Sequence, residues 1–174
     1  TLAASTEARA LNFSIVAAGS QATLKVGSSQ WNPKLGLGGG LLFEAGNIEV
    51  GAIYLQRKFT IGSFTLAATY LDIPVLYRLS LGSVVSLGAG LYYSNGMGQV
   101  KTEGGSSSQE SFADAGLQKQ DFGAVAALGF YIPAGVLTRI LVEGRYKFGL
   151  YNVSTDSSLQ AKYDTLVFLL GVRF

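Results

Sequence analysis

The chain has 174 residues with a net charge of +2, and 48% of them are hydrophobic but only 14% charged, against about a quarter charged in an ordinary soluble domain. This length fits a single domain, residues 1–174, and the small net charge without any Lys/Arg run excludes nucleic acid as a partner. The absence of Cys excludes disulfides and thiolate metal sites, and the absence of His removes the commonest general base and metal ligand.

Eight stretches of about ten residues, taken in chain order, alternate between apolar and polar or small residues, and clusters of Gly, Asn, Ser or Pro separate them. This period of two predicts β-strands, and no apolar run is long enough for a transmembrane helix. The predicted strands are residues 10–18, 35–44, 48–57, 65–79, 85–95, 121–132, 139–151 and 163–174.

The predicted connections alternate in length. Short ones at 45–47, 80–84 and 133–138 alternate with mostly longer, polar ones at 19–34, 58–64, 96–120 and 152–162. Outer-membrane barrels show this pattern, with turns on the periplasmic side and loops outside. We therefore expect both termini to be periplasmic, with residues 1–9 as a periplasmic N-terminal segment. The Gly- and Ser-rich stretch 104–108 predicts that 96–120 is a long flexible outer loop.

The two faces of the predicted strands differ in side-chain size and charge. One face carries bulky apolar residues, and the other carries glycines together with all nine charges assigned to strand interiors. The residues expected to face lipid are Leu37, Leu41, Val50, Ile73, Val75, Leu87, Leu91, Leu128, Val142, Phe168 and Leu170. The charges on the opposite face are four acids, Glu44, Glu49, Asp72 and Glu143, and five bases, Arg57, Arg78, Arg145, Lys147 and Arg173.

Side-chain size decides which face is the inside. A closed barrel of about eight strands has an interior that only side chains can fill, which favours small residues there and bulky residues outside. An apolar exterior of this extent is unsuited to water but is required in lipid, and unpaired strand edges are too costly in hydrocarbon for an open sheet. The sequence therefore predicts an all-β, closed, antiparallel up-and-down transmembrane β-barrel. The alternative is an ordinary water-soluble barrel or sandwich with an apolar core.

The interior charges should pair with one another, because a buried charge needs a partner. We expect Glu143 to lie opposite residue 172 and close to Arg173, and Asp72 to meet Arg145 across the barrel. Glu44, Glu49 and Arg78 should form a lower layer near the periplasm. A salt-bridge plug is favoured over an ion path or gate, because eight strands leave little free bore.

Catalysis is not expected. The known barrel enzymes rely on a histidine, which this chain lacks. Glu44 and Glu49 are better explained as partners of Arg78 than as an acid/base pair. The glycines at 36, 38 and 40 precede no helix that a phosphate would cap, so they indicate lumen spacing and not a nucleotide loop. We expect no catalytic residues, no metal and no cofactor.

Two parts of the sequence resemble a known family. Residues 70–77 have the sequence YLDIPVLY. They resemble a strand of the porin-like outer-membrane β-barrel domain family in which Tyr-Leu is followed by an acidic residue and then Ile-Pro, and PorT-type proteins belong to this family. The segments 121–123, 142–146 and 170–174 resemble that family's last three strands. The resemblance implies a fold like OmpA- and OmpX-type eight-stranded barrels and a bacterial outer-membrane location. It also implies that Phe174 is the C-terminal signal read by the barrel-assembly machinery.

These observations favour a structural or surface-binding protein that displays extracellular loops. A narrow pore for ions or small solutes is the alternative, and a soluble lipocalin-like carrier is a third. The expected partners are outer-membrane lipid, the barrel-assembly machinery and an unidentified extracellular partner bound through the loops, and the expected state is a monomer. Fold alone does not choose among these roles.

Overall fold

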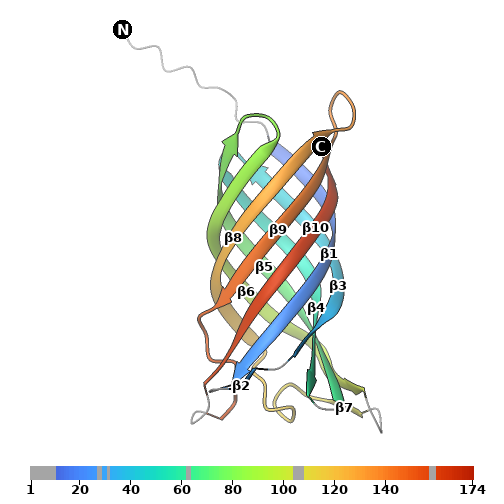
Figure 1. Ribbon diagram of the computed structural model, residues 1–174, viewed down its shortest axis with the longest axis vertical. Helices are drawn as coiled ribbons and strands as arrows, with labels where there is room; N and C mark the ends of the chain where they lie inside the picture. Colours follow the sequence, from blue (N-terminus) through green and yellow to red (C-terminus); the bar gives the residue numbers. More distant parts are fainter. Residues whose placement is uncertain (1–10, 27–28, 31, 62–63, 104–107, 157–159) are drawn as a thin grey trace.

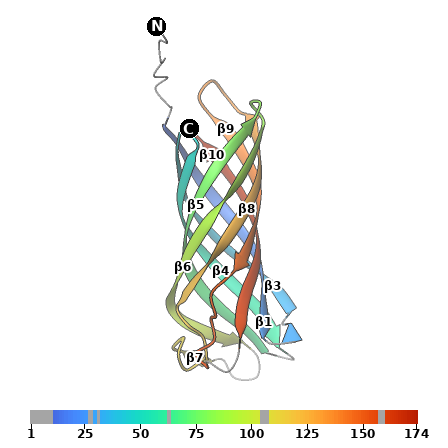
Figure 2. The same cartoon turned by 90° about the vertical axis from the view of Figure 1, so that its left-hand side faces the viewer.

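Eight long antiparallel strands form a tall barrel with strongly tilted walls in the computed structural model of the chain (Figures 1 and 2). The structure describes residues 11–26, 29–30, 32–61, 64–103, 108–156 and 160–174. The barrel strands are β1 (Leu11–Val26), β3 (Asn32–Ala45), β4 (Ile48–Ile61), β5 (Phe64–Leu81), β6 (Val85–Glu103), β8 (Gln120–Pro133), β9 (Arg139–Gly149) and β10 (Ala161–Arg173). Two short strands, β2 (Ser29–Gln30) and β7 (Ser108–Glu110), pair with the ends of β1 and β6.

The barrel is closed and simple in topology. Each long strand pairs with the next one along the chain, and β10 pairs with β1 to complete the circle. At the seam, the backbone N–H of Phe174 donates to the carbonyl of Phe13 at 2.8 Å, and the N–H of Phe13 donates back at 3.2 Å. The predicted closed up-and-down barrel of eight strands is therefore confirmed, with short strands added at one end. No membrane-spanning helix occurs among the described residues.

The two ends of the barrel differ. The turns after β3, β5 and β8 share one end with the start of β1 and the end of β10, and we call this end the turn rim (top of Figure 1). Two of these turns need glycine, because Gly46 and Gly82 have φ values of 63° and 72°. The opposite end carries β2, β7 and the remaining connections, and we call it the loop rim.

Most strands are longer than the sequence predicted. β1 continues to Val26, so most of the predicted connection at 19–34 is strand. β4 and β5 likewise occupy all but two residues of the predicted connection at 58–64. The predicted ends were set where the apolar alternation stops, but the backbone ladder continues beyond that point, for example to the pair Val26 with Ala161. Hydrogen bonding between strands needs no apolar side chains.

The predicted outer loop at 96–120 is strand over part of its length. β6 runs on to Glu103 and pairs with β5, and β7 folds back against β6. Residues 111–119 form turns that bury Phe112 and Leu117, so apolar packing fixes this segment. The predicted N-terminal segment 1–9 lies outside the described residues.

Candidate functional site

The outer wall of the barrel is apolar. The eleven residues predicted to face lipid all lie on the outside, with exposed fractions from 38% for Ile73 to 67% for Leu37. On β5 the outward apolar residues run from Leu81 to Leu71, which spans roughly 26 Å along the axis at about 3.4 Å per residue and a tilt of about 40°. A membrane-spanning barrel needs an apolar band of about 25 Å. The wall therefore has the height and composition that lipid requires.

Leu128→Arg tests the outer wall. Leu128 lies outward in the middle of β8, where an arginine would place its charge near the bilayer midplane. We expect the free energy of unfolding in lipid vesicles to fall by about 2 kcal/mol. Leu137→Arg is the matched control, because Leu137 lies 84% exposed in the turn after β8 at the turn rim, where an arginine should cost almost nothing. Equal effects of the two variants in denaturant titrations would argue against a lipid-facing wall.

The inner wall holds the nine charged residues predicted for the lumen and one more, Asp121. All ten lie on inward-facing positions, and all except Glu44 and Arg173 are almost fully buried. The structure arranges them in three groups along the barrel axis. If the loop rim is taken as the upper end, the reverse of Figure 1, one pair lies at the turn rim and a ring of four lies above it. A second cluster of four, the upper cluster, lies nearer the loop rim.

The ring consists of two glutamates that alternate with two arginines. Glu49 accepts from Arg78 at 2.5 Å with one oxygen and from Arg145 at 2.8 Å with the other. Glu143 binds the same two arginines, at 2.6 Å to Arg78 and 2.5 Å to Arg145. Each charge therefore has two opposite neighbours, which is how a buried ionic group offsets its cost of desolvation. The members come from β4, β5 and β9, so the ring also ties together distant parts of the wall.

The upper cluster is organised around Arg57. Its two terminal nitrogens donate to Asp121 at 2.7 Å and to Asp72 at 3.1 Å, and the second of them also donates to Ser94 at 2.9 Å. Lys147 forms an ion pair with the other carboxylate oxygen of Asp72. The cluster therefore contains two acids and two bases and is neutral as a group.

Aromatic rings complete the surroundings of the upper cluster. The guanidinium of Arg57 lies 4.2 Å from the ring centroid of Tyr70 and 5.0 Å from that of Tyr163. The ammonium of Lys147 lies 3.8 Å from the centroid of Tyr92, whose hydroxyl donates to Asp121 at 3.1 Å. Contact with ring faces stabilises cations that have lost their water.

The third group closes the turn rim. Arg173 donates to both carboxylate oxygens of Glu44, at 2.8 and 3.1 Å, and its guanidinium lies 4.5 Å from the ring centroid of Tyr131. A two-pronged contact of this kind is strong and well oriented. It joins β10 to β3 across the seam strand β1.

The predicted partners within the lumen need correction. Asp72 does not meet Arg145, because the two belong to different clusters. Glu143 pairs with Leu169 in the β9–β10 ladder and not with residue 172, so its charge partners are arginines of the ring and not Arg173. Directly paired residues share a face, and residue 172 points outward whereas Glu143 points inward.

Glu44 also has a different partner from the one predicted. It binds Arg173 at the turn rim, whereas Arg78 binds Glu49 and Glu143. The expected lower layer therefore contains Glu49 and Arg78 but not Glu44. Missing from the prediction altogether was Asp121, which was assigned to a strand end. It shares the inward parity of Gly123 two residues later, and that parity was the signal that could have found it.

With Asp121 included, the lumen charges balance at five acids and five bases. The cavity between the ring and the upper cluster has a volume of only about 10 Å³, which is room for one water molecule at most. A path for hydrated ions needs far more space. The charges and the apolar side chains packed among them therefore fill the barrel at mid-height.

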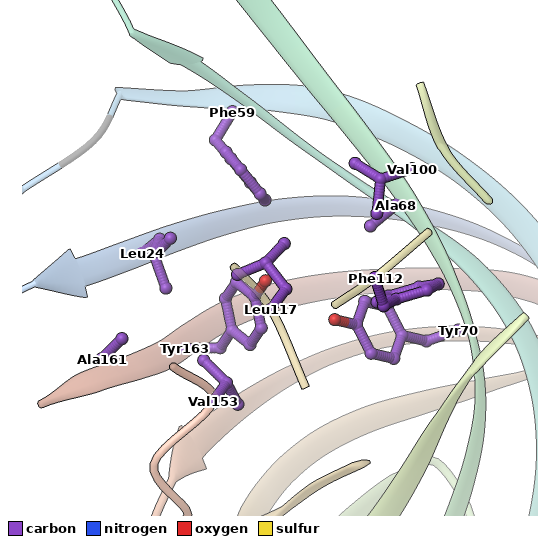
Figure 3. Packing of buried hydrophobic residues seen from close by; sticks show 10 residues of the cluster. All are labelled: Leu24, Phe59, Ala68, Tyr70, Val100, Phe112, Leu117, Val153, Ala161 and Tyr163. Atoms are coloured by element: carbon purple, nitrogen blue, oxygen red, sulfur yellow. The ribbon is translucent and has the colours of Figure 1, made fainter. Parts of the chain in front are cut away.

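A layer of apolar residues covers the upper cluster at the loop rim (Figure 3). Phe112 packs edge-on against Tyr70 with centroids 5.5 Å apart, and Tyr163 lies 6.1 Å from both Tyr70 and Phe59. We call this layer the aromatic cap. Its members are Leu24, Phe59, Ala68, Tyr70, Val100, Phe112, Leu117, Val153, Ala161 and Tyr163. Phe112, Leu117 and Val153 reach it from the connections outside the barrel strands, so these connections fold inward over the lumen.

The chemistry that this site offers is charge pairing. Every lumen carboxylate forms an ion pair with an arginine or a lysine. Among the described residues, no group of three or more Asp or Glu side chains is placed to hold a metal ion. The geometry supports a rigid, filled lumen.

Comparison with known proteins adds a family and a fold. A family model described as outer membrane protein beta-barrel domain matches residues 8–155, and no curated protein matches the sequence significantly. Neisserial surface protein A is similar in structure, with a TM-score of 0.63 and 15% identity over 92% of this chain and 95% of that one. Ail, the attachment invasion locus protein of Yersinia pestis, solved with the heparin analogue sucrose octasulfate, has a TM-score of 0.55 and 16% identity, covering 94% of this chain and 99% of its own.

Proposed function

The chain belongs to the outer membrane protein beta-barrel domain family, and from this premise we propose that it is a sealed barrel of the bacterial outer membrane with a structural or surface-binding role. In this role the wall anchors the protein in lipid, and the loop rim presents the connections to the exterior. The filled lumen is the observation that carries the proposal. Paired charges block the lumen and packed aromatic rings cover it, which favours a rigid barrel over a channel for ions or solutes.

Two separate layers support the sealed state. The ring of Glu49, Arg78, Glu143 and Arg145 spans the lumen, and opening it would separate four ion pairs between buried side chains. Above it, the aromatic cap covers the upper cluster with fully buried side chains such as Phe59 and Tyr163. A solute would have to displace both layers.

The proposed orientation places the turn rim in the periplasm and the loop rim outside the cell. Short turns and both chain ends on one rim support it, because outer-membrane barrels keep their turns and termini on the periplasmic side. Under this orientation the seam at Phe174 lies on the periplasmic side, where its proposed role as the barrel-assembly signal would be exercised. The finer resemblance to PorT-type proteins stays a prediction.

The proposal assigns the protein no catalytic role and no cofactor. Its lumen acids are all held by cations, and the chain has no histidine to act as a base. The partner bound by the loop rim is not specified by the fold. Neisserial surface protein A and Ail, the attachment invasion locus protein, have a similar fold, and their names support a surface role.

Planar-bilayer recording tests the sealed lumen directly. Reconstituted protein should show no stable conductance, because the 10 Å³ cavity between the two charge clusters cannot hold a hydrated ion path. A variant in which Arg145 is replaced by alanine should add brief, irregular openings at most, because the aromatic cap remains. Regular open-channel steps in the unmodified protein would contradict the proposal and favour a narrow pore for ions or small solutes.

A further inference from the structure

All six lysines outside the lumen lie on the loop-rim half of the molecule. They are Lys25, Lys34, Lys58, Lys101, Lys119 and Lys162. Three of them form one row across the outer wall. In the ladders, Lys34 on β3 pairs with Lys58 on β4, Lys58 pairs with Ala67 on β5, and Ala67 pairs with Lys101 on β6. Directly paired residues point to the same side of a sheet, and we call this set the lysine row.

Like charges directly opposite each other destabilise a sheet, as at the pair of Lys34 and Lys58. The ammonium of Lys34 donates to the hydroxyl of Thr65 at 3.3 Å, which is a neutral group and leaves the charge unbalanced. Among the residues whose side chains are described, no carboxylate forms an ion pair with Lys34, Lys58 or Lys101. The contrast with Lys25 on β1 is clear, because Lys25 is paired with Asp164. The row therefore presents positive charge that the chain leaves available for an external anion.

A hollow of about 340 Å³ lies on the outer wall beside the row, at the level where the wall changes from apolar to polar. Its lining includes the polar residues Gln56, Thr69 and Gln99 together with Lys101. Among the described residues, no other side chain hydrogen-bonds to the side chains of Gln56, Thr69 or Gln99. These groups can therefore donate to a ligand without breaking an existing contact.

The other side of the hollow is apolar. Leu37, Tyr54 and Met97 line it, and all three are well exposed at the upper margin of the apolar band. A ligand that fills the hollow therefore meets cations and amides towards the loop rim and hydrocarbon towards the turn rim. Only an amphiphile matches both halves.

We propose that the lysine row and this hollow bind the phosphorylated headgroup of an anionic glycolipid of the outer leaflet. The phosphates would lie against Lys34, Lys58 and Lys101, the sugar hydroxyls would reach the amides of Gln56 and Gln99, and the acyl chains would run down the apolar wall. Lysine stems can follow an apolar surface while their ammonium groups reach a phosphate layer. This inference rests on the proposed membrane setting but not on the function of the loops.

Binding of bisphosphoryl lipid A to the protein in zwitterionic nanodiscs tests the inference. The triple variant Lys34→Ala, Lys58→Ala, Lys101→Ala should bind this lipid at least about tenfold more weakly, because each lysine near an anionic leaflet contributes roughly a fivefold gain in affinity. The matched control is Lys25→Ala, Lys119→Ala, Lys162→Ala, which removes the same charge from other parts of the loop-rim half. It should change the affinity by less than about twofold.

The outcomes separate a site from general attraction. Equal weakening by both triple variants, or none by either, would overturn the proposal. The de-acylated phosphorylated disaccharide serves as a soluble probe, and binding of it as tight as that of the lipid would overturn the assignment to a membrane ligand. The heat-dependent gel mobility of each variant checks that it is folded. Because nanodiscs expose both rims, the result does not depend on the orientation or the conductance of the barrel.

Discussion

Glu49→Gln is expected to lower the free energy of unfolding by about 3 to 5 kcal/mol, although it changes side-chain volume very little. Glu49 is the acid that accepts from Arg78 with one oxygen and from Arg145 with the other. The amide group of glutamine would turn a donor towards one of these two guanidinium groups, which have only donors themselves. The ring would keep two buried arginines and one buried glutamate, and an unbalanced buried charge carries a cost of this size.

Complete removal of the ring is the control that identifies the cause. A variant with methionine at Glu49, Arg78, Glu143 and Arg145 keeps similar volume and leaves no charge unpaired. Because replacement of a whole buried ionic group by apolar residues is often close to neutral, this variant should be more stable than Glu49→Gln. Denaturant titrations in the same vesicles provide the comparison. A quadruple variant much less stable than the single one would mean that the ring contributes net stability, and a neutral single variant would mean that the lumen admits water.

The faces of the strands were predictable because the side-chain period of a strand is two. A residue such as Leu87 or Arg145 is assigned to a face by its parity within its strand, and this needs no knowledge of neighbouring strands. Side-chain size then indicates which face is inside, since only side chains fill the interior of eight strands and the glycines share the parity of the charges. For this reason, sequence alone indicated both the closed barrel and the charged interior.

The strand ends at the loop rim were not predictable in the same way. β1 continues as strand through Gln21 to Val26 although its outward residues are no longer apolar. The apolar alternation reports the span of the wall within lipid, whereas the ladder of hydrogen bonds reports where the strand ends. The two agree at the turn rim, where turns follow the wall directly, and they differ at the loop rim.

Prediction of the ion pairs requires the register between neighbouring strands, which the pattern within a single strand does not give. The predicted contact of Glu143 with residue 172 conflicts with parity, because directly paired residues share a face and Val172 points outward. The partner of Glu143 must therefore lie an even number of positions along the chain from it, and the ladder in fact pairs it with Leu169. In other ladders the register itself changes, between Lys34 and Gly38 in β3–β4 and between Ala67 and Thr69 in β5–β6.

Gly123→Ala is expected to lower the free energy of unfolding by about 3 kcal/mol, whereas Gly144→Ala should be neutral. A Cβ atom at Gly123, on the inner face of β8, would lie 2.0 Å from the carbonyl oxygen of Phe148 and 2.7 Å from the ring of Tyr92. Both are held in place, the first by the β8–β9 ladder and the second by its contacts with Asp121 and Lys147. Relief would need a shift of whole strands, which makes the overpacking expensive.

Gly144 provides the matched comparison because it lies in the neighbouring strand on the outer face. A Cβ atom there would meet nothing within 4 Å, and alanine in an extended strand loses less backbone entropy on folding than glycine does. The two variants therefore make the same chemical change on opposite sides of one wall. Denaturant midpoints in vesicles that fall for Gly123→Ala alone would show that the curvature of a narrow, filled barrel is what demands glycine inside. Equal midpoints would mean that the strands have room to separate, which a lumen packed around the charge clusters does not allow.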